Sequence, residues 1–144
     1  SWYIMIHIKS QYSETAIECT IRDLEDGRGR GIYAYQDINA GQVVETSPII
    51  NMDRSYFELP QVLRNVVFGC GASTVVALGV GSLFNHADDA ALSYEVKIEK
   101  GLLFFIARHA IKKGEELTIN YNHTSGETSA DTWFAAEDRG FTKR

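Results

Sequence analysis

The sequence predicts a β-rich fold, built from several small sheets with few short helices. Apolar and polar residues alternate from Ile4 to Ile8, which is the period-2 pattern of a half-buried strand, and the pattern returns in 92–98. Turn sequences such as Asp26-Gly27 and Lys113-Gly114 separate the apolar runs. Many short strands with frequent turns are typical of a β domain that folds back on itself.

In chain order, the runs rich in β-branched or aromatic residues predict strands at 2–9, 16–21, 31–35, 43–50, 92–98, 102–107 and 117–121. Helix is predicted at two places only. The first begins at Ser55 or Gln61 and continues to about Phe68, with Pro60 ending a first turn or starting a second. The second covers Ala130 to Asp138.

Length and charge limit the classes of function. A chain of 144 residues fits one domain, 1–144, with a core of its own. The net charge is -5 and no large cluster of basic residues occurs, so direct nucleic-acid binding is disfavoured. The acidic balance suits a basic partner better.

Two further features concern the compartment. Cys19 and Cys70 belong to no C-x-x-C pair, so cysteine cannot form a zinc cluster here, and no metal site is expected. Free thiols fit a reducing intracellular compartment, the cytoplasm or nucleus. The uncharged stretch 66–84 is long enough to suggest a membrane span, but its four glycines and three hydroxyl side chains favour buried core instead.

Four segments could carry chemistry, although each has a purely structural alternative. The glycine-rich segment 27–34 lets a backbone pass close to a ligand, yet alone it is more typical of a hairpin loop, and it lacks the dinucleotide-binding context. Asn85-His86 could be a turn with a core histidine. Segment 107–121 is a strand, a charged turn and a second strand, and the aromatic residues of 131–134 could cap a core.

Together, the order and spacing of these segments resemble the SET domain over about residues 15–135. The match is most specific in Gly114-Glu115-Glu116-Leu117-Thr118 followed by Tyr121. A compact form without cysteine-rich flanking regions, similar to the small viral and bacterial SET proteins, is the nearest subtype. The resemblance implies a pseudoknot between the Asn-His segment and the tyrosine strand, a variable insert at about 51–74, and S-adenosylmethionine-dependent protein-lysine N-methyltransferase activity.

The resemblance also implies roles for individual residues. Backbone groups of the glycine loop would follow the methionine part of S-adenosylmethionine, Asn85 would hold its amino or carboxylate end, and His86 would meet the adenine through its main chain. One of two C-terminal aromatic residues, preferably the tryptophan, would cover the adenine. The implied cofactor-binding residues are Arg28, Gly29, Arg30, Asn85, His86, Trp133 and Phe134. The catalytic residue would be Tyr121, and the substrate channel would comprise Phe84, Ile119 and Tyr121.

The implied reaction is an in-line attack of a neutral lysine amine on a sulfonium methyl carbon, so alignment is the main task. A narrow apolar channel lowers the pKa of the lysine. A free phenol has a pKa of about 10, so Tyr121 is expected to orient groups rather than to act as a base. Ile119 stands where relatives carry Phe or Tyr, which predicts di- or trimethylation. Asn120 and Ala87 replace the family's frequent Asp and Ser, which could loosen the pseudoknot.

The expected partner is a basic protein or peptide bearing a lysine, with a histone tail as the most familiar target and other protein lysines left open. Tyr56, Phe57 and Phe68 are candidates for lining the peptide groove. One alternative is a catalytically inactive SET-like module that binds peptides. Another is an unrelated β-rich interaction domain, to which the acidic charge is equally suited.

Overall fold

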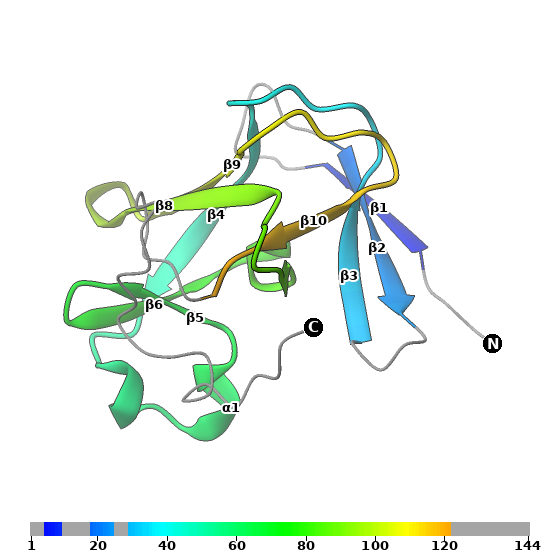
Figure 1. The fold of residues 1–144 in the computed structure, drawn as a ribbon. Helices are drawn as coiled ribbons and strands as arrows, with labels where there is room; N and C mark the ends of the chain where they lie inside the picture. Colours follow the sequence, from blue (N-terminus) through cyan, green and yellow to red (C-terminus); the bar gives the residue numbers. More distant parts are fainter. Residues whose placement is uncertain (1–4, 10–17, 25–28, 122–144) are drawn as a thin grey trace.

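The structure, a computed structural model, describes residues 5–9, 18–24 and 29–121, which form two five-stranded sheets (Figure 1). The first sheet contains, in spatial order, β1 (Met5–Lys9), β2 (Glu18–Leu24), β3 (Gly29–Ala34), β10 (Glu116–Ile119) and β7 (Asn85–His86). The second contains β5 (Val67–Cys70), β6 (Ser73–Ala77), β4 (Val43–Asn51), β9 (Leu102–Ala107) and β8 (Leu92–Lys97). Four short helices lie between consecutive strands: η1 (Tyr56–Glu58) and α1 (Gln61–Arg64) between β4 and β5, η2 (Gly79–Ser82) between β6 and β7, and η3 (Ile98–Lys100) between β8 and β9.

The first sheet is assembled from both ends of the described chain. β1, β2 and β3 pair consecutively and antiparallel. β10 then joins β3 antiparallel, with Leu117 opposite Ile32, and β7 adds to the far side of β10 in parallel. β10 therefore lies in the middle of the molecule, between the β1–β3 hairpins and the second sheet (Figure 1).

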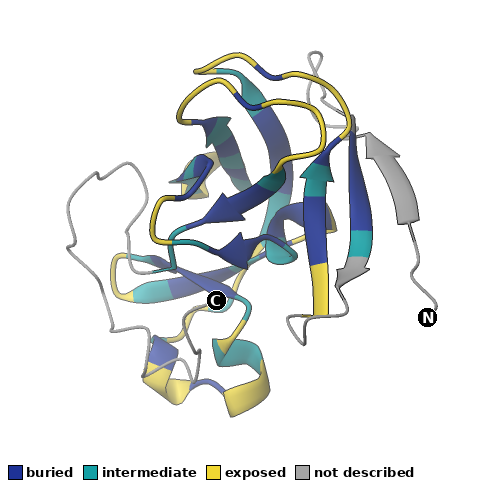
Figure 2. Cartoon of the chain, turned by 45° about the vertical axis from the view of Figure 1, so that its right-hand side comes forward, coloured by how far each residue is buried: buried dark blue, intermediate teal, exposed yellow. Residues whose placement is uncertain are grey.

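The two sheets share one apolar core. Ile32 and Leu117 of the first sheet and Leu103 and Phe105 of the second are completely buried. Phe105 is surrounded by aromatic rings, because its centroid lies 4.7 Å from that of Phe84 and 5.8 Å from that of Phe68. In Figure 2 the buried residues run along both sheets, while exposed residues concentrate in the turns and short helices.

The segment between β4 and β5 builds a second, smaller core. Ser55 and Glu58 form a reciprocal capping box at η1. Arg64 then donates hydrogen bonds to the carbonyls of Phe57 and Leu59, which locks η1 against α1. Tyr56 is 1% exposed in this core, so the prediction that it lines a peptide groove is wrong. Phe57, another residue predicted to line the groove, is 65% exposed.

The main strand predictions are confirmed, with shifts of a few residues at their ends. The predicted helix, however, ends at Arg64 rather than near Phe68, because Val67 and Phe68 belong to β5 and pair with Val76 and Val75. β-branched residues favour that strand, and two glycines that follow them weaken a helix. The predicted helix 130–138 lies outside the described residues.

The long uncharged stretch proves to be β5, β6 and η2, all packed into the two cores. None of the helices in the described residues is long and apolar enough to cross a membrane. Both cysteines are free, with Cys19 buried and Cys70 half-buried. Burial, and secondarily the Glu45 carboxylate, raises the pKa of the Cys19 thiol to about 12, so this thiol is an inert core residue.

Candidate active site

The Asn-His pair and the tyrosine segment, far apart in the sequence, lie side by side. Thr118 pairs with Asn85 and Ile119 with His86 in the parallel β7–β10 ladder. The backbone N–H of Ala87 continues the ladder by donating to the carbonyl of Ile119 at 3.0 Å. This is the contact that the expected pseudoknot requires.

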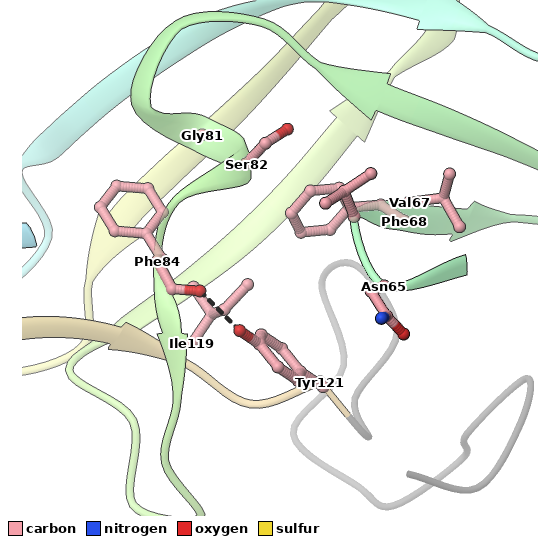
Figure 3. Close-up of a pocket in the computed structure, with 9 residues that line it drawn as sticks. Asn65, Val67, Phe68, Gly81, Ser82, Phe84, Ile119 and Tyr121 are labelled. Atoms are coloured by element: carbon pink, nitrogen blue, oxygen red, sulfur yellow. Dashed lines mark hydrogen bonds between the residues drawn. The ribbon is translucent and has the colours of Figure 1, made fainter. Parts of the chain in front are cut away.

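Tyr121 follows β10 and is held at both its backbone and its phenol. Its backbone N–H donates to Nδ1 of His86 at 3.1 Å, which turns the chain out of the strand after Ile119. Its hydroxyl donates to the carbonyl of Phe84 at 2.8 Å (Figure 3). The predicted strand 117–121 therefore stops short of the tyrosine, and the phenol is fixed at the edge of a cleft.

Polar and apolar groups contribute about equally to the surface of that cleft, and Figure 3 shows Ile119 and Phe84 beside the phenol. Its empty volume, including the part open to solvent, is about 240 Å³. The lining residues come from the β5 region, η2, β10 and the residues that follow them: Asn65, Val66, Val67, Phe68, Gly81, Ser82, Phe84, Ile119 and Tyr121. All three residues of the expected substrate channel are present, and Phe68, a groove candidate, is a buried part of the wall.

His86 is clamped between two partners. Nδ1 accepts the hydrogen bond from Tyr121, and Nε2 lies 3.0 Å from Oδ1 of Asp88. The imidazole is 4% exposed, and its centroid lies 5.1 Å from that of the Tyr121 ring. The side chain of His86 thus orients the backbone of the tyrosine.

The side chain of Asn85 extends from β7 toward β3, which lies on the opposite side of β10. Its Nδ2 donates to the carbonyl of Arg30 at 2.8 Å and to Oε1 of Glu116 at 2.9 Å. Both acceptors are oxygens, which fixes the orientation of the amide. The side chain is 5% exposed, so a ligand held here would meet a rigid amide.

The start of β3, next to this amide, has open space around Gly29. Gly29 has φ of 76° and is exposed, and a Cβ placed there would meet no heavy atom within 4 Å. A side chain would be strained at that φ, so glycine keeps the strand entrance clear. Three expected cofactor residues, Arg28, Trp133 and Phe134, lie outside the described residues.

Sequence reasoning missed several residues of the site. Glu116 holds Asn85, Asp88 holds His86, and the wall residues 65–67 precede or begin a strand that was read as helix. Glu116 and Asp88 both lie within motifs that the sequence analysis singled out. Their contacts could not be predicted, because they depend on pairing between distant strands. Within the described ranges, no group of three His, Cys, Asp or Glu side chains could hold a metal ion.

Comparisons with known proteins agree on one kind of domain. The SET domain family model matches residues 29–122. A Schizosaccharomyces pombe protein, histone-lysine N-methyltransferase, H3 lysine-37 specific, is 30% identical over 105 residues, which are 70% of this chain and 71% of that protein.

Two solved structures have a similar fold. A Plasmodium falciparum protein assigned as a histone methyltransferase has a TM-score of 0.61 at 24% identity, covering 74% of this chain and 94% of the other. The Cryptosporidium protein CpSET8 has a TM-score of 0.56 at 22% identity, covering 73% of this chain and 57% of the other.

Proposed function

This chain belongs to the SET-domain family, and we propose that it transfers methyl groups from S-adenosylmethionine to the side-chain amine of a lysine in a basic protein. The observation that carries the proposal is the hydrogen bond from the Tyr121 hydroxyl to the Phe84 carbonyl at the edge of the cleft. That bond fixes a phenol oxygen beside a cleft whose walls include the apolar residues Phe84 and Ile119.

The residues present suit the cofactor that this family generally uses. When bound, S-adenosylmethionine supplies a methyl carbon activated by a sulfonium charge. Asn85 and the backbone at Gly29 and Arg30 would hold its methionine part, with the main chain of His86 near the adenine. Nδ2 of Asn85 donates to the Arg30 carbonyl and to the Glu116 carboxylate, so the amide sits beside a negative charge that suits the positively charged amino end better than the carboxylate end.

The cleft would receive the lysine. Phe84 and Ile119 are 3% and 2% exposed, so they would surround the aliphatic stem with apolar groups. A charged ammonium is disfavoured there, which lowers the lysine pKa and makes the neutral amine available. Tyr121 would align that amine, because its oxygen can accept a hydrogen bond from N–H while its own hydrogen is directed at Phe84. Alignment of this kind supplies up to about 7–11 kcal/mol of the barrier.

Ile119 supports a further part of the proposal, the addition of two or three methyl groups. It is an aliphatic wall of the cleft and carries no hydroxyl that could hold a water in place of a methyl group. A mass spectrum of the product after exhaustive turnover tests this directly. Product that stops at monomethyl-lysine would contradict it.

A histone is the first substrate to test, because the fission yeast relative is named for lysine 37 of histone H3. The net charge of -5 favours such a basic partner. A substrate of this kind places the protein in the nucleus or cytoplasm. The chain would be incubated with labelled S-adenosylmethionine and each core histone, and the modified lysine would be mapped.

Tyr121→Phe is the decisive variant in that assay. Removal of one preorganised hydrogen-bond donor from an oxyanion hole lowers kcat by about 10²–10³, and we expect a loss of this order here. Binding of S-adenosylmethionine, measured by calorimetry, should change little, because Asn85 and β3 are untouched. Equal turnover by wild type and variant would remove Tyr121 from the chemistry. Absence of both turnover and cofactor binding in the wild type would favour the inactive peptide-binding module.

A further inference from the structure

Asp88 follows the Asn-His pair by two residues and holds its histidine from the solvent side. Oδ1 of Asp88 lies 3.0 Å from Nε2 of His86. The imidazole is 4% exposed, whereas the Asp88 side chain is 59% exposed. The carboxylate is therefore the outer end of a chain of contacts whose inner end is the active-site tyrosine.

The hydrogen bonds determine which nitrogen of His86 carries the hydrogen. The backbone N–H of Tyr121 donates to Nδ1 at 3.1 Å, so Nδ1 is an acceptor without a hydrogen. The ring hydrogen then lies on Nε2 and points at Asp88. An acceptor at one ring nitrogen selects the tautomer of the whole ring. Without the carboxylate, the ring could carry its hydrogen on Nδ1, where it would oppose the N–H of Tyr121.

The backbone of Asp88 makes a second tie to the same segment. Nδ2 of Asn120 donates to the carbonyl of Asp88 at 3.2 Å. Asn120 directly precedes Tyr121, so Asp88 contacts both residues that set the position of the tyrosine backbone. The expectation that Asn120 loosens the pseudoknot is therefore wrong at this contact, because an ionised aspartate could not donate to that carbonyl and would repel it.

We propose that Asp88 is a positioning residue for methyl transfer. Its carboxylate holds His86 in the Nε2–H tautomer and so fixes the backbone from which the Tyr121 hydroxyl reaches Phe84. This inference rests on the role proposed for Tyr121. Asp88 acts on the alignment of the reacting groups and not on either binding step, so its effect is expected in kcat rather than in KM.

The test compares Asp88→Ala and Asp88→Asn in the full chain with a histone substrate. Asp88→Ala removes the acceptor, and we expect kcat to fall about tenfold, equivalent to roughly 1.4 kcal/mol of barrier. KM for the peptide and for S-adenosylmethionine should stay within about twofold, because binding is not affected. Asp88→Asn retains an oxygen that accepts the hydrogen bond from Nε2, so it should keep about half or more of the wild-type kcat.

The neighbouring Asp89 provides a matched control. Its side chain is 97% exposed and its carboxylate lies 3.7 Å from Arg108, on the surface. Asp89→Ala removes the same charge one residue away, and wild-type kcat is expected. Asn120→Asp removes the second tie and should lower kcat in the same direction as Asp88→Ala.

Two kinetic outcomes overturn the inference: an Asp88→Ala kcat within about twofold of wild type, which is under roughly 0.4 kcal/mol, or an Asp88→Asn variant as impaired as Asp88→Ala. ¹⁵N chemical shifts of His86 in the wild-type protein give an independent answer, even where a variant fails to fold. The Nε2–H tautomer is expected, and the Nδ1–H tautomer would refute the proposal. If the wild type transfers no methyl group, the proposed function fails. Comparison of the His86 ¹⁵N shifts in the wild type and in Asp88→Ala then decides whether Asp88 holds the tautomer.

Discussion

Gly81→Ala provides a direct test of how tightly the cleft is built into the core. Gly81 lies in η2, and a Cβ added there would overlap Oγ of Ser47 and lie 2.8 Å from Cε2 of Phe105 and 2.9 Å from Cβ of Ala77. Carbon atoms prefer a separation of about 3.5–4.0 Å, so all three neighbours would have to move. Phe105 is completely buried and Ala77 is 2% exposed, which leaves them little room.

The expected loss of stability is large for one methyl group. Overpacking a core lowers the free energy of unfolding by about 1–3 kcal/mol, and three simultaneous contacts argue for the upper end, about 3 kcal/mol. At about 3–4 °C per kcal/mol for a domain of this size, the melting temperature should fall by about 10 °C. Turnover should fall as well, because η2 leads through Leu83 to the Phe84 carbonyl that holds Tyr121.

The assay is thermal and urea unfolding of Gly81→Ala, Ser47→Ala and the double variant. Oγ of Ser47 is buried and has no hydrogen-bond partner among the described residues. Ser47→Ala alone should leave stability unchanged or raise it by up to about 1 kcal/mol. The double variant should recover about 1 kcal/mol of the loss, because the overlap with Oγ is relieved. A melting temperature of Gly81→Ala within about 2 °C of wild type would refute this packing.

Two further predictions concern Glu116 and Cys19. Glu116→Ala removes an acceptor that orients the Asn85 amide and should raise the Kd for S-adenosylmethionine about tenfold, which is roughly 1.4 kcal/mol. Glu116→Gln keeps an oxygen acceptor but loses the negative charge, so its affinity should lie between those of Glu116→Ala and wild type. Calorimetry that finds equal affinity for all three would contradict the role of Glu116. Burial raises the pKa of Cys19 from 9.0 to about 12, so above pH 9 the folded state retains a proton that the unfolded chain loses. Stability should therefore fall as pH rises toward 12, by up to about 1.4 kcal/mol per pH unit. Urea unfolding should show that this part of the slope disappears in Cys19→Ala and persists in Cys70→Ala.

Strand positions were predictable because period-2 alternation and short runs of apolar, β-branched or aromatic residues both favour strands. The runs at 43–50 and 102–107 became β4 and β9 nearly unchanged. β9 buries every second residue, whereas β4 buries four consecutive residues from Val44 to Ser47. The stretch after Arg64 was misread, because a short apolar run of Val67 and Phe68 is compatible with either helix or strand until its partner β6 is known.

The candidate site divides in a similar way. The resemblance to the SET domain made Asn85, His86, Ile119 and Tyr121 candidates, because they lie in motifs whose order and spacing match that family. It could not show that the tyrosine leaves its strand at Ile119, because that turn depends on a hydrogen bond to His86 from another strand.

The sequence by itself therefore determined the β-rich class, the positions of most strands along the chain and the residue types available for chemistry. Only the tertiary structure decided which groups meet: the Phe84 carbonyl with the phenol, Glu116 with Asn85, and Asp88 with His86. The physical reason is that polarity patterns report whether a residue faces a core, whereas hydrogen-bond partners depend on the pairing and register of strands distant in the chain. The parallel β7–β10 ladder sets that register here.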